Sequence, residues 1–523
     1  MGKVFLFFLC CYSCYCSAQQ WKKTFGQGYW ADWVIEDYDK GYVILGTKGN
    51  AGYGLVIKTD INGNVLWSKH IGNNQYNMSV NNIELTPDNG LIIAGTTTKY
   101  GNQQDAYILK LNACGNLDWC SDVYTPTISY DLGWRVKPSS DHGYILLGLY
   151  NNSNPNLRTN LFKFDSLGNL QWHQAYLPDS LAFEDDGYDV MADSSGYLVT
   201  AVVYYPDPGQ SGGWERFYLI KTDTSGNKLW TNIYGKNSYY HGFPSTSLKS
   251  HSRNFYSFGC HDINQTDYQV PSLIKVFSNG LSSYNKDILS DTYGGGIGSA
   301  DWLDENTFIL GSGWAANSTH EVNVFLKTDT LGNLLQSHIL DTATGGIIST
   351  AKTFDHKFVG VATDYVNNQD VILAYKINSN LQWDSIYSHS YTYDSLCSHP
   401  ITSDTIDPDC GLIVNVQEPL TSPETCKLQV FPNPTTNKLT IVFPKYLLVN
   451  DNSPPVKSTT IYHQWKSTIL ESYDLSGKLV FQREIPKDQT RLELDVSSWG
   501  KGMYFFRLSN NKNTVAGEKV VIE

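Results

Sequence analysis

VIKTDINGNVLW, residues 56 to 67, consists of two short apolar runs joined by the pentapeptide DINGN. Asp60, Asn62 and Asn64 place side-chain oxygens at alternate positions, as ligands are placed in a calcium loop. The same residues suit a tight turn between antiparallel strands, because Asp favours the first turn position and Gly63 can adopt a positive φ. Other copies of the stretch decide between a metal site and a turn.

The stretch recurs six more times, and a second apolar unit precedes each copy. The later copies are ILKLNACGNLDW (108–119), LFKFDSLGNLQW (161–172), LIKTDTSGNKLW (219–230), LIKVFSNGLSSY (273–284), FLKTDTLGNLLQ (325–336) and AYKINSNLQW (374–383). The preceding units are GYVILG from Gly41, GLIIAG from Gly90, GYILLG from Gly143, GYLVTA from Gly196, NFYSFG from Asn254, NTFILG from Asn306 and KFVGVA from Lys357. Successive units begin 49 to 58 residues apart, so the chain is built from repeats.

Comparing the copies favours the turn over the metal site. Calcium ligands would need oxygen atoms at the same places in each copy, with Gly sixth in the EF-hand pattern, whereas Gly63 is fourth. The third position is Asn62 in the first copy and then Cys114, Leu167, Ser225, Asn279 and Leu331. What recurs is Asp or Asn first, Gly fourth and Asn fifth, which is typical of a type I turn that ends in a left-handed Gly. We therefore predict no metal.

Each unit contains about four short apolar, β-branched or aromatic runs separated by turn signals. Four strands in about 50 residues are typical of a propeller blade, whereas the coils of a parallel β-helix, the structural alternative, are shorter. The prediction is an all-β fold, a seven-bladed β-propeller. Eight blades are the alternative, because WKKTFG (21–26) adds a strand before the first unit and ITSDTIDPDCGLIVNV (401–416) repeats two strands after the seventh.

A Trp follows the turn at a constant offset in the first four copies, and we expect it to pack between neighbouring blades. These residues are Trp67, Trp119, Trp172 and Trp230, with Tyr284 and Gln336 in the next two copies. The pattern resembles quinoprotein-like and related propellers, in which a strand, an Asp-containing turn, Gly and Trp recur. The resemblance covers about residues 21–390 and implies architecture alone, since such folds include dehydrogenases, lyases, glycan binders and scaffolds.

The N-terminus predicts export. Lys3, an apolar run from Val4 to Tyr12 and small residues up to Ala18 are typical of a signal peptide over residues 1–18. A membrane anchor is the alternative, but the run is much shorter than the roughly 20 residues of a transmembrane span. A lipidated Cys is a further alternative, although the usual Leu and small-residue spacing is absent.

Six cysteines follow residue 18 and could oxidise after export: Cys114, Cys120, Cys260, Cys397, Cys410 and Cys426. Two pairs that are close in sequence suggest bonds, Cys114 with Cys120 and Cys397 with Cys410, although spacing leaves the connectivity open. Buried free thiols are the alternative. No Cys-x-x-Cys pair follows the signal peptide, so neither a zinc knuckle nor a thioredoxin-like site is supported.

A second pattern begins after QEPLTSPETC (417–426), which has the composition of a linker. Strand-like segments in residues 427–523 predict a small antiparallel β-sandwich. The domains expected are therefore a signal peptide (1–18), the propeller (19–395), closing strands and linker (396–426) and this C-terminal domain (427–523).

The C-terminal domain resembles the C-terminal sorting domain of the type IX secretion system of Bacteroidota. The residues that carry the resemblance are Pro432, Asn433 and Pro434 of a Pro-Asn-Pro signature, Asp474 and Gly477 of an Asp-x-x-Gly turn, Gly502 and Tyr504 of Gly-x-Tyr, and Lys519 in the last strand. An insertion between Phe443 and Glu471 departs from the pattern. The resemblance implies recognition by type IX machinery and removal of the domain, with release or attachment to the outer-membrane surface. Triplets such as Asp179-Ser180-Leu181 and Asp404-Thr405-Ile406 resemble the O-glycosylation signal of that phylum.

Catalytic patterns are weak. GQSGG (209–213) fits Gly-x-Ser-x-Gly, but a strand follows Ser211 where a nucleophile elbow needs a helix. Acidic residues gather at Glu184, Asp185, Asp186 and Asp189, and His241 follows two tyrosines; we interpret the carboxylates as solvated loop charge. No motif predicts a cofactor, and the catalytic residues, if any, are unknown. With 38 basic against 51 acidic residues, nucleic acid is not an expected partner.

Aromatic side chains near predicted loops are the candidate ligand-binding residues, because they can stack on sugar rings or contact a protein. They are Tyr204, Tyr205, Trp214, Tyr239, Tyr240 and Trp314. Local packing within loops is the alternative role. The sequence therefore favours a secreted, non-catalytic propeller that binds protein or glycan. The alternative is an extracellular hydrolase or lyase acting on polysaccharide or peptide at the channel mouth.

Overall fold

The computed structural model describes residues 20–49, 52–73, 75–100, 104–124, 131–150, 158–176, 184–206, 213–234, 242–262, 269–288, 294–317, 320–341, 345–414, 428–443, 468–474, 478–486, 489–510 and 513–523. The chain divides into two compact units, Met1–Val416 and Gln417–Glu523. Every regular element in the described ranges is a β-strand, which confirms the all-β prediction. None of these residues forms a helix of the length and apolarity that crossing a membrane requires.

The described strands of the first unit form seven sheets of four or five strands, as expected for propeller blades. From the innermost strand outward, the first three are β2 (Tyr29–Glu36), β3 (Tyr42–Lys48), β4 (Gly54–Thr59), β5 (Val65–Ile71), β29 (Asp404–Ile406); β6 (Met78–Leu85), β7 (Leu91–Thr97), β8 (Asp105–Leu111), β9 (Leu117–Tyr124), β30 (Gly411–Val414); and β10 (Leu132–Pro138), β11 (Tyr144–Tyr150), β12 (Arg158–Phe164), β13 (Leu170–Tyr176). The next two are β14 (Glu184–Asp193), β15 (Gly196–Pro206), β16 (Gly213–Thr222), β17 (Lys228–Tyr234); and β18 (Gly242–Lys249), β19 (Phe255–Asp262), β20 (Gln269–Val276), β21 (Ser282–Asp287). The last two are β22 (Gly294–Asp304), β23 (Thr307–Asn317), β24 (His320–Asp329), β25 (Leu334–Asp341); and β26 (Ile347–Lys352), β27 (Phe358–Val366), β28 (Gln369–Ile377), β1 (Lys22–Phe25).

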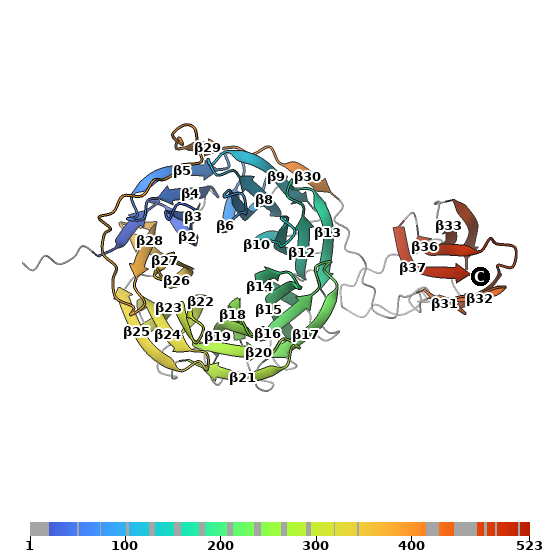
Figure 1. Cartoon of the computed structure of the whole chain (residues 1–523). Helices are drawn as coiled ribbons and strands as arrows, with labels where there is room; N and C mark the ends of the chain where they lie inside the picture. Colours follow the sequence, from blue (N-terminus) through green and yellow to red (C-terminus); the bar gives the residue numbers. More distant parts are fainter. Residues whose placement is uncertain are drawn as a thin grey trace, which may run out of the picture. The chain divides into compact units, whose positions relative to one another are not determined.

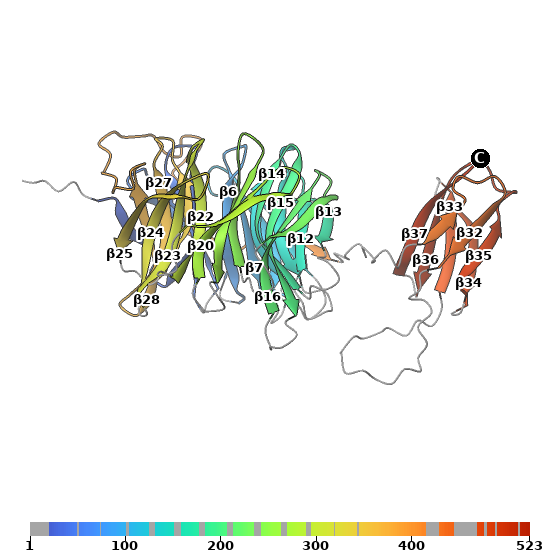
Figure 2. The same ribbon diagram turned by 90° about the horizontal axis from the view of Figure 1, so that it is seen from below.

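Figure 1 shows these sheets side by side around a ring, with β2, β6, β10, β14, β18, β22 and β26 nearest the axis. Within a sheet the first four strands alternate in direction, so they run between two edges of the ring (Figure 2). Tight turns such as 37–41 and 60–64 join strands at one edge, which we call the turn edge. The opposite edge, where the first strand begins and the second ends, is called the loop edge.

The DINGN stretch is the turn between β4 and β5. Asp60 Oδ1 accepts hydrogen bonds from the backbone N–H groups of Asn62 and Asn64, both at 2.8 Å, and Gly63 has a φ of 74°. Asp165, Asp223 and Asp329 bond their own turns in the same way. The carboxylate is occupied by backbone donors, which confirms the turn interpretation.

Outer tryptophans contact the turn of the next sheet, as the constant offset predicted. Added methyl groups on Gly226 and Gly280 would each lie 2.8 Å from the indole of the preceding sheet, Trp172 and Trp230 respectively. The indole N–H of Trp119 donates to the turn carbonyl of Ser166 at 3.2 Å. Gln336, which replaces Trp, donates from Nε2 to Asn380 O at 2.7 Å, so an amide keeps this hydrogen bond where the ring is lost.

A buried Lys on the third strand is a repeated feature that the sequence analysis missed. Lys58 is fully buried and pairs with Asp37 and Asp39, and Lys110 pairs with Asp88 and Asp118, both at 2.7 Å. Asp37 and Asp39 belong to the turn between β2 and β3, and Asp88 to the turn between β6 and β7, whereas Asp118 is on β9, so each Lys ties the first turn of its own sheet to the third strand. Because a buried ammonium without a partner is strongly destabilising, these pairs make the turn sequences interdependent.

The N-terminal strand β1 pairs with β28 and supplies the outer strand of the sheet that the seventh unit forms. Trp21 lies beside it, and its indole N–H donates to Ile61 O in the turn of the first sheet at 2.9 Å. The sheet of the seventh unit therefore meets the first sheet through the same kind of Trp-to-turn contact that joins other sheets. Residues 401–416 were expected to repeat two strands of a unit, and this expectation is wrong. β29 and β30 instead extend the first and second sheets in parallel with β5 and β9.

Residues 384–414, which we call the belt, run along the outside of the first two sheets (Figure 1). The belt is held by bonds between Cys114 and Cys397 and between Cys120 and Cys410, so the expected pairing of sequence neighbours is wrong. The reason is topological, because parallel docking of the belt brings Cys397 and Cys410 to two sites on the second repeat. Cys260 is a buried thiol on β19, and Cys426 lies outside the described residues.

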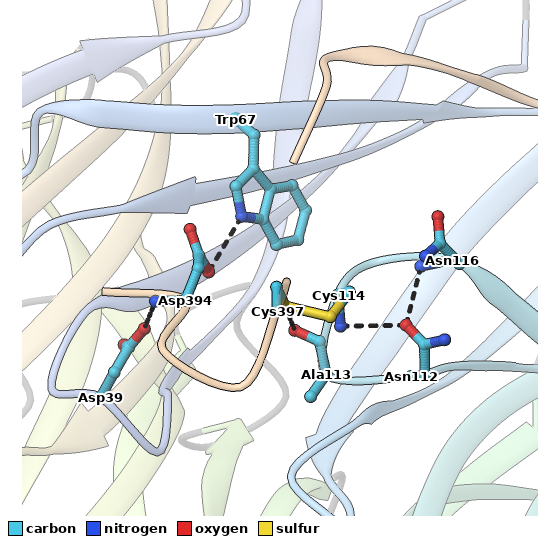
Figure 3. The surroundings of a disulfide bond; sticks show 8 residues. All are labelled: Asp39, Trp67, Asn112, Ala113, Cys114, Asn116, Asp394 and Cys397. Carbon is cyan, nitrogen blue, oxygen red and sulfur yellow. Dashed lines mark hydrogen bonds between the residues drawn. A yellow bond between two sulfur atoms is a disulfide. The ribbon is translucent and has the colours of Figure 1, made fainter. Parts of the chain in front are cut away.

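Figure 3 shows how the belt changes the contact made by Trp67. Its indole N–H donates to Asp394 of the belt at 3.3 Å, and Cys397 Sγ lies 3.7 Å from Ala113 O in the neighbouring turn. Asp394 N in turn donates to Asp39 at 3.0 Å. The belt thus lies at the boundary between the first and second sheets, where a disulfide attaches it to the turn of the second sheet.

The second unit contains two antiparallel sheets around one core, in line with the predicted small sandwich. The strands are β31 (Gln429–Phe431), β32 (Lys438–Val442) and β35 (Arg491–Asp495) in one sheet, and β34 (Leu479–Ile485), β33 (Thr468–Asp474), β36 (Gly502–Asn510) and β37 (Asn513–Ile522) in the other. Leu439 and Ile441 of the first sheet and Leu470 and Phe506 of the second are buried in that core.

We predict that Gly226→Ala destabilises the protein more than Gly28→Ala. The two glycines have nearly the same φ, 80° and 82°, so each substitution costs roughly 1–2 kcal/mol in backbone strain. Only Gly226 faces an indole, because nothing lies within 4 Å of a methyl group on Gly28. Urea unfolding should show an additional loss of about 1–3 kcal/mol for Gly226→Ala. Equal losses would contradict the proposed packing.

Peptide mapping without reductant should recover Cys114 linked to Cys397 and Cys120 linked to Cys410. Replacing Cys397 or Cys410 by Ser should lower the free energy of unfolding by about 2–4 kcal/mol, since each bond closes a long loop. Cys426→Ser serves as the control. A peptide that links Cys114 to Cys120 would contradict the assignment.

Candidate functional site

The innermost strands share a β-bulge at one place, which the sequence pattern did not reveal. The register shifts in all seven described sheets, between Ala31 and Trp33, Val80 and Asn82, Gly133 and Arg135, Gly187 and Asp189, Pro244 and Thr246, Ile297 and Ser299, and Ile347 and Ser349. A bulge adds a residue and changes the direction of its side chain. The extra residues include Asp32, Asn81, Trp134 and Tyr188.

Arg135 connects three sheets on the axial side of the ring. Its guanidinium centre lies 4.6 Å from the ring centroid of Trp33 and 5.1 Å from that of Trp134. Nη1 also donates to Asn81 O at 3.4 Å. Trp33 is on β2 of the first sheet and Arg135 is on β10 of the third sheet, so their contact joins two sheets that the second sheet separates in chain order. We call Asp32, Trp33, Asn81, Trp134 and Arg135 the axial cluster.

The axial cluster contains polar atoms that the protein itself does not satisfy. Asp32 Oδ2, Trp134 Nε1 and Arg135 Nε are buried and have no hydrogen-bond partner among the described residues. Buried polar atoms in folded proteins almost always have a partner, in the protein or outside it. Next to the cluster, Lys137 forms an ion pair with Glu84, so that pair is already charge-balanced.

Burial raises the pKa of Asp32 to about 7, although the positive charge of Arg135 and a hydrogen bond with Thr47 oppose this shift. Its carboxyl group therefore changes charge near neutral pH. The axial cluster thus combines a carboxyl whose charge changes near neutral pH with a guanidinium that contacts two indoles.

The interpretation of the acidic run as solvated loop charge is wrong for Asp185 and Asp189 of β14. Asp185 is fully buried and accepts hydrogen bonds from Thr159 N at 3.1 Å and Arg158 at 3.4 Å. Asp189 is also buried and accepts from Thr246 and Ser247 of the next sheet. Strand alternation and the bulge turn these carboxylates toward different sheets. They therefore join blade-like sheets and do not converge as a catalytic pair.

Asp186 lies with aromatic residues near the loop edge. Tyr204 donates from its hydroxyl to Asp186 Oδ2 at 3.3 Å, and Tyr188 meets Trp134 edge-on with ring centroids 6.5 Å apart. Burial, followed by the charges of Asp186 and Glu215, raises the pKa of Tyr188 to about 12. This group continues the axial cluster toward the fourth sheet, because Trp134 belongs to both.

The described aromatic candidates lie near the same edge of the ring. Tyr204 and Tyr205 are at the end of β15 and Trp214 at the start of β16, where Tyr205 is opposite Trp214 in the register. Trp314 is near the end of β23 in the sixth sheet. Tyr239 and Tyr240 lie outside the described residues, as do Ser211 and His241.

Sequence reasoning missed Trp30, which is near the start of β2 and is 46% exposed at the loop edge. Trp30 lies in an innermost strand, whereas the tryptophans that pack between sheets lie in outer strands. Within the described residues, no group of three or more His, Cys, Asp or Glu side chains is arranged to hold a metal ion.

In the second unit, the sorting-motif residues make local contacts. Asn433 accepts a hydrogen bond from Val521 N at 2.9 Å, which ties the Pro432 and Pro434 segment to the last strand. Asp474 accepts from Lys478 N at 3.0 Å across its turn, and Tyr504 donates to Gly500 O at 2.7 Å. Gly502 has a φ of 152°. Lys519 is on β37, and Gly477 lies outside the described residues.

Residues 429–523 match the family model of the secretion system C-terminal sorting domain. A domain of this family at the C-terminus indicates a substrate of the type IX secretion system, exported to the cell surface or the medium. It also implies that the chain interacts with the type IX machinery. No curated protein matches the chain.

Several solved structures are similar to this chain. Drosophila Semaphorin 1a, extracellular domains 1–2, has 8% identity and a TM-score of 0.44, with 68% of this chain and 88% of that chain covered. A protein of unknown function from Dyadobacter fermentans has 9% identity and a TM-score of 0.43, with 58% and 95% covered. PorZ, a surface component of the type IX secretion system of Porphyromonas gingivalis, has 9% identity and a TM-score of 0.27, with 96% and 82% covered. With TM-scores below 0.5, these likenesses establish neither fold nor function.

Asp32→Asn should change how stability depends on pH. An Asp whose pKa is raised from about 4 in the unfolded chain to about 7 in the folded protein stabilises the fold only below that range. Stability should therefore fall as pH rises from 4 to 7, by at most about 1.4 kcal/mol per pH unit from this group. Asp32→Asn should lack the part of this fall in stability that the Asp32 carboxyl causes.

The measurement is urea unfolding of the parent, Asp32→Asn and Asp409→Asn at pH 5 and pH 8. Asp409 is the control because its carboxyl is exposed. Between the two pH values, Asp32→Asn should gain about 2 kcal/mol relative to the parent. Parallel behaviour of parent and Asp32→Asn would contradict a titrating Asp32.

Proposed function

We propose that this protein is a non-catalytic seven-bladed β-propeller, exported by the type IX system, that binds an extracellular protein or glycan at its loop edge. Its parts are a signal peptide (1–18), the propeller (19–395), closing strands and linker (396–426) and a sorting domain (427–523). Pro432, Asn433, Pro434, Asp474, Gly477, Gly502, Tyr504 and Lys519 carry the sorting signal. After the signal peptide and sorting domain are removed, the propeller is released or attached to the outer-membrane surface.

Seven blades are supported by the matching sheets and their common bulge. The innermost strands of neighbouring sheets also bond to one another, as when Val136 N donates to Asn82 at 2.8 Å. The same kind of contact joins the seventh unit to the first, where Val34 N donates to Ser349 at 3.2 Å. A ring of this kind places one end of every blade at the loop edge.

The observation that supports binding is the contrast between the two edges of the ring. At the turn edge, Asp and Lys side chains are used in bonds that hold turns, as in the pairs of Lys110. Near the loop edge, Trp30 is exposed, and Tyr204, Tyr205, Trp214 and Trp314 lie in strands that end or begin there. Rigid strands that present aromatic residues are suited to recognition.

A hydrolase or lyase remains the second candidate because of a single group, Asp32. A carboxyl with a pKa of about 7 could act as a general acid. Binding is favoured, because Asp185 and Asp189 are committed to contacts between sheets and do not form a catalytic pair.

Screening the full chain against a glycan array and against surface and extracellular proteins tests the proposal. The double variant Tyr205→Ala, Trp214→Ala should weaken binding of the ligand found by at least about 10-fold, as expected when aromatic contacts are removed. Phe277→Ala is the matched control, because Phe277 is a 42% exposed aromatic in a turn at the opposite edge. Silence in both screens would overturn the binding proposal, and turnover of a bound glycan would replace it with the hydrolase or lyase.

A further inference from the structure

Two of the sorting-motif residues in the second unit are used inside its own fold. Tyr504 is buried, and its hydroxyl donates to Gly500 O at 2.7 Å. Asn433 accepts a hydrogen bond from Val521 N at 2.9 Å. These contacts hold a turn and the last strand in place. A partner that recognises the folded unit therefore needs exposed residues elsewhere on it.

The larger sheet of the second unit carries an exposed apolar row on the face turned away from the core. Tyr473 of β33 is the register partner of Leu479 on β34 and of Phe505 on β36. Leu479 and Phe505 are each 43% exposed, whereas Ser472, the neighbour of Tyr473, is fully buried on the core side. Residues opposite one another on paired strands are in contact, so the row is continuous across three strands. Exposed apolar side chains that are contiguous, and not scattered, mark interaction sites.

A fixed ion pair lies beside this row. Arg507 donates from Nε and Nη2 to Glu471 Oε2 at 2.9 and 2.6 Å, and Nη2 also donates to the Tyr473 hydroxyl at 3.1 Å. The Arg507 side chain is 42% exposed and that of Glu471 only 11%, so the guanidinium is the member of the pair that solvent reaches. Because these side chains are already ordered, a partner loses less entropy on docking. Tyr and Arg are also enriched among residues that carry binding energy.

Charge distinguishes the second unit from the rest of the chain. Residues 427–523 contain 13 basic and 9 acidic residues, whereas residues 1–426 contain 25 basic and 42 acidic residues. The basic residue Lys519 is the register partner of Phe505 on the last strand, so it extends the row to a fourth strand. A partner with an acidic surface would attract the second unit and repel the remainder of the chain. Such a charge difference orients the chain as it docks.

We infer that Leu479, Tyr473, Phe505 and Arg507, which we call the docking face, bind a component of the type IX machinery whose surface is apolar at its centre and acidic around it. The inference rests on the proposed export route and specifies which part of the second unit the machinery contacts. The family match supplies the partner. The exposed row, the ordered ion pair and the basic charge supply the place and the chemistry.

The test is export of full-length variants from a bacterium that has a type IX system. The measured quantity is the ratio of protein at the cell surface and in the medium to protein retained in the periplasm. The double variant Leu479→Ser, Phe505→Ser should lower this ratio at least about 10-fold, as expected when exposed apolar contacts are removed from an interface. The retained chain should keep a C-terminal unit that resists protease as in the parent, because both side chains are exposed.

Phe431→Ser is the matched control, because Phe431 is 48% exposed on β31 of the other sheet. It should be exported like the parent. Charge is tested by Lys519→Glu against Lys501→Glu, which reverses an exposed charge in the turn before β36. An acidic partner predicts that Lys519→Glu lowers export more than Lys501→Glu does.

Export of the double variant at the parent ratio would overturn the inference. A retained double variant whose C-terminal unit is digested would also overturn it, because the face would then act in folding. Dimers of the purified parent that the double variant abolishes, with export unchanged, would assign the face to a second copy of the chain. Binding to phosphatidylglycerol vesicles with the same dependence would assign it to a lipid surface.

A chain that ends at residue 426 separates this inference from the proposed function. Export of that shortened chain would overturn the proposed export route and the docking face together. Its retention in the periplasm, combined with normal export of Leu479→Ser, Phe505→Ser, would overturn the docking face alone.

Discussion

The contact between an outer Trp and the turn Gly of the next sheet is the constraint on which the first unit depends. Trp172 and Trp230 lie so close to Gly226 and Gly280 that these turn positions have no room for a side chain. Glycine is needed at these positions for two reasons, because φ is positive and because the indole lies so close. The contact sets the spacing of neighbouring sheets and so determines which innermost strands meet at the axis.

At the boundary between the first and second sheets, the outer Trp and the turn of the next sheet both contact the belt. There the indole N–H of Trp67 donates to Asp394, and Cys397 is bonded to Cys114 in the turn that would otherwise accept it. Parallel docking of β29 and β30 adds backbone hydrogen bonds along two outer strands. Segments more than 280 residues apart are thereby held covalently, which fixes the belt to the second sheet.

The axial cluster shows why a group of residues drawn from several sheets is difficult to predict from sequence. Asp32 and Arg135 are about a hundred residues apart and follow no common motif. Asp32 is the extra residue at the bulge of β2 and Arg135 follows the bulge of β10, and a bulge leaves no clear mark in the hydrophobic pattern. The aromatic candidates named from sequence were found by composition near loops. Among these candidates, Tyr204 contacts the group next to the axial cluster, because its hydroxyl donates to Asp186 beside Tyr188 and Trp134.

The sequence by itself determined the repeat, the strand class, the turn chemistry and the sorting domain, because each depends on residues that are neighbours in the chain. DINGN could be identified as a turn, and its Trp as a contact between sheets, from spacing alone. Only the tertiary structure decided the cysteine pairing, the parallel course of the belt, the burial of Asp185 and Asp189, and the contact of Arg135 with Trp33. These features depend on which distant strands become neighbours around the ring, and local sequence carries little information about that.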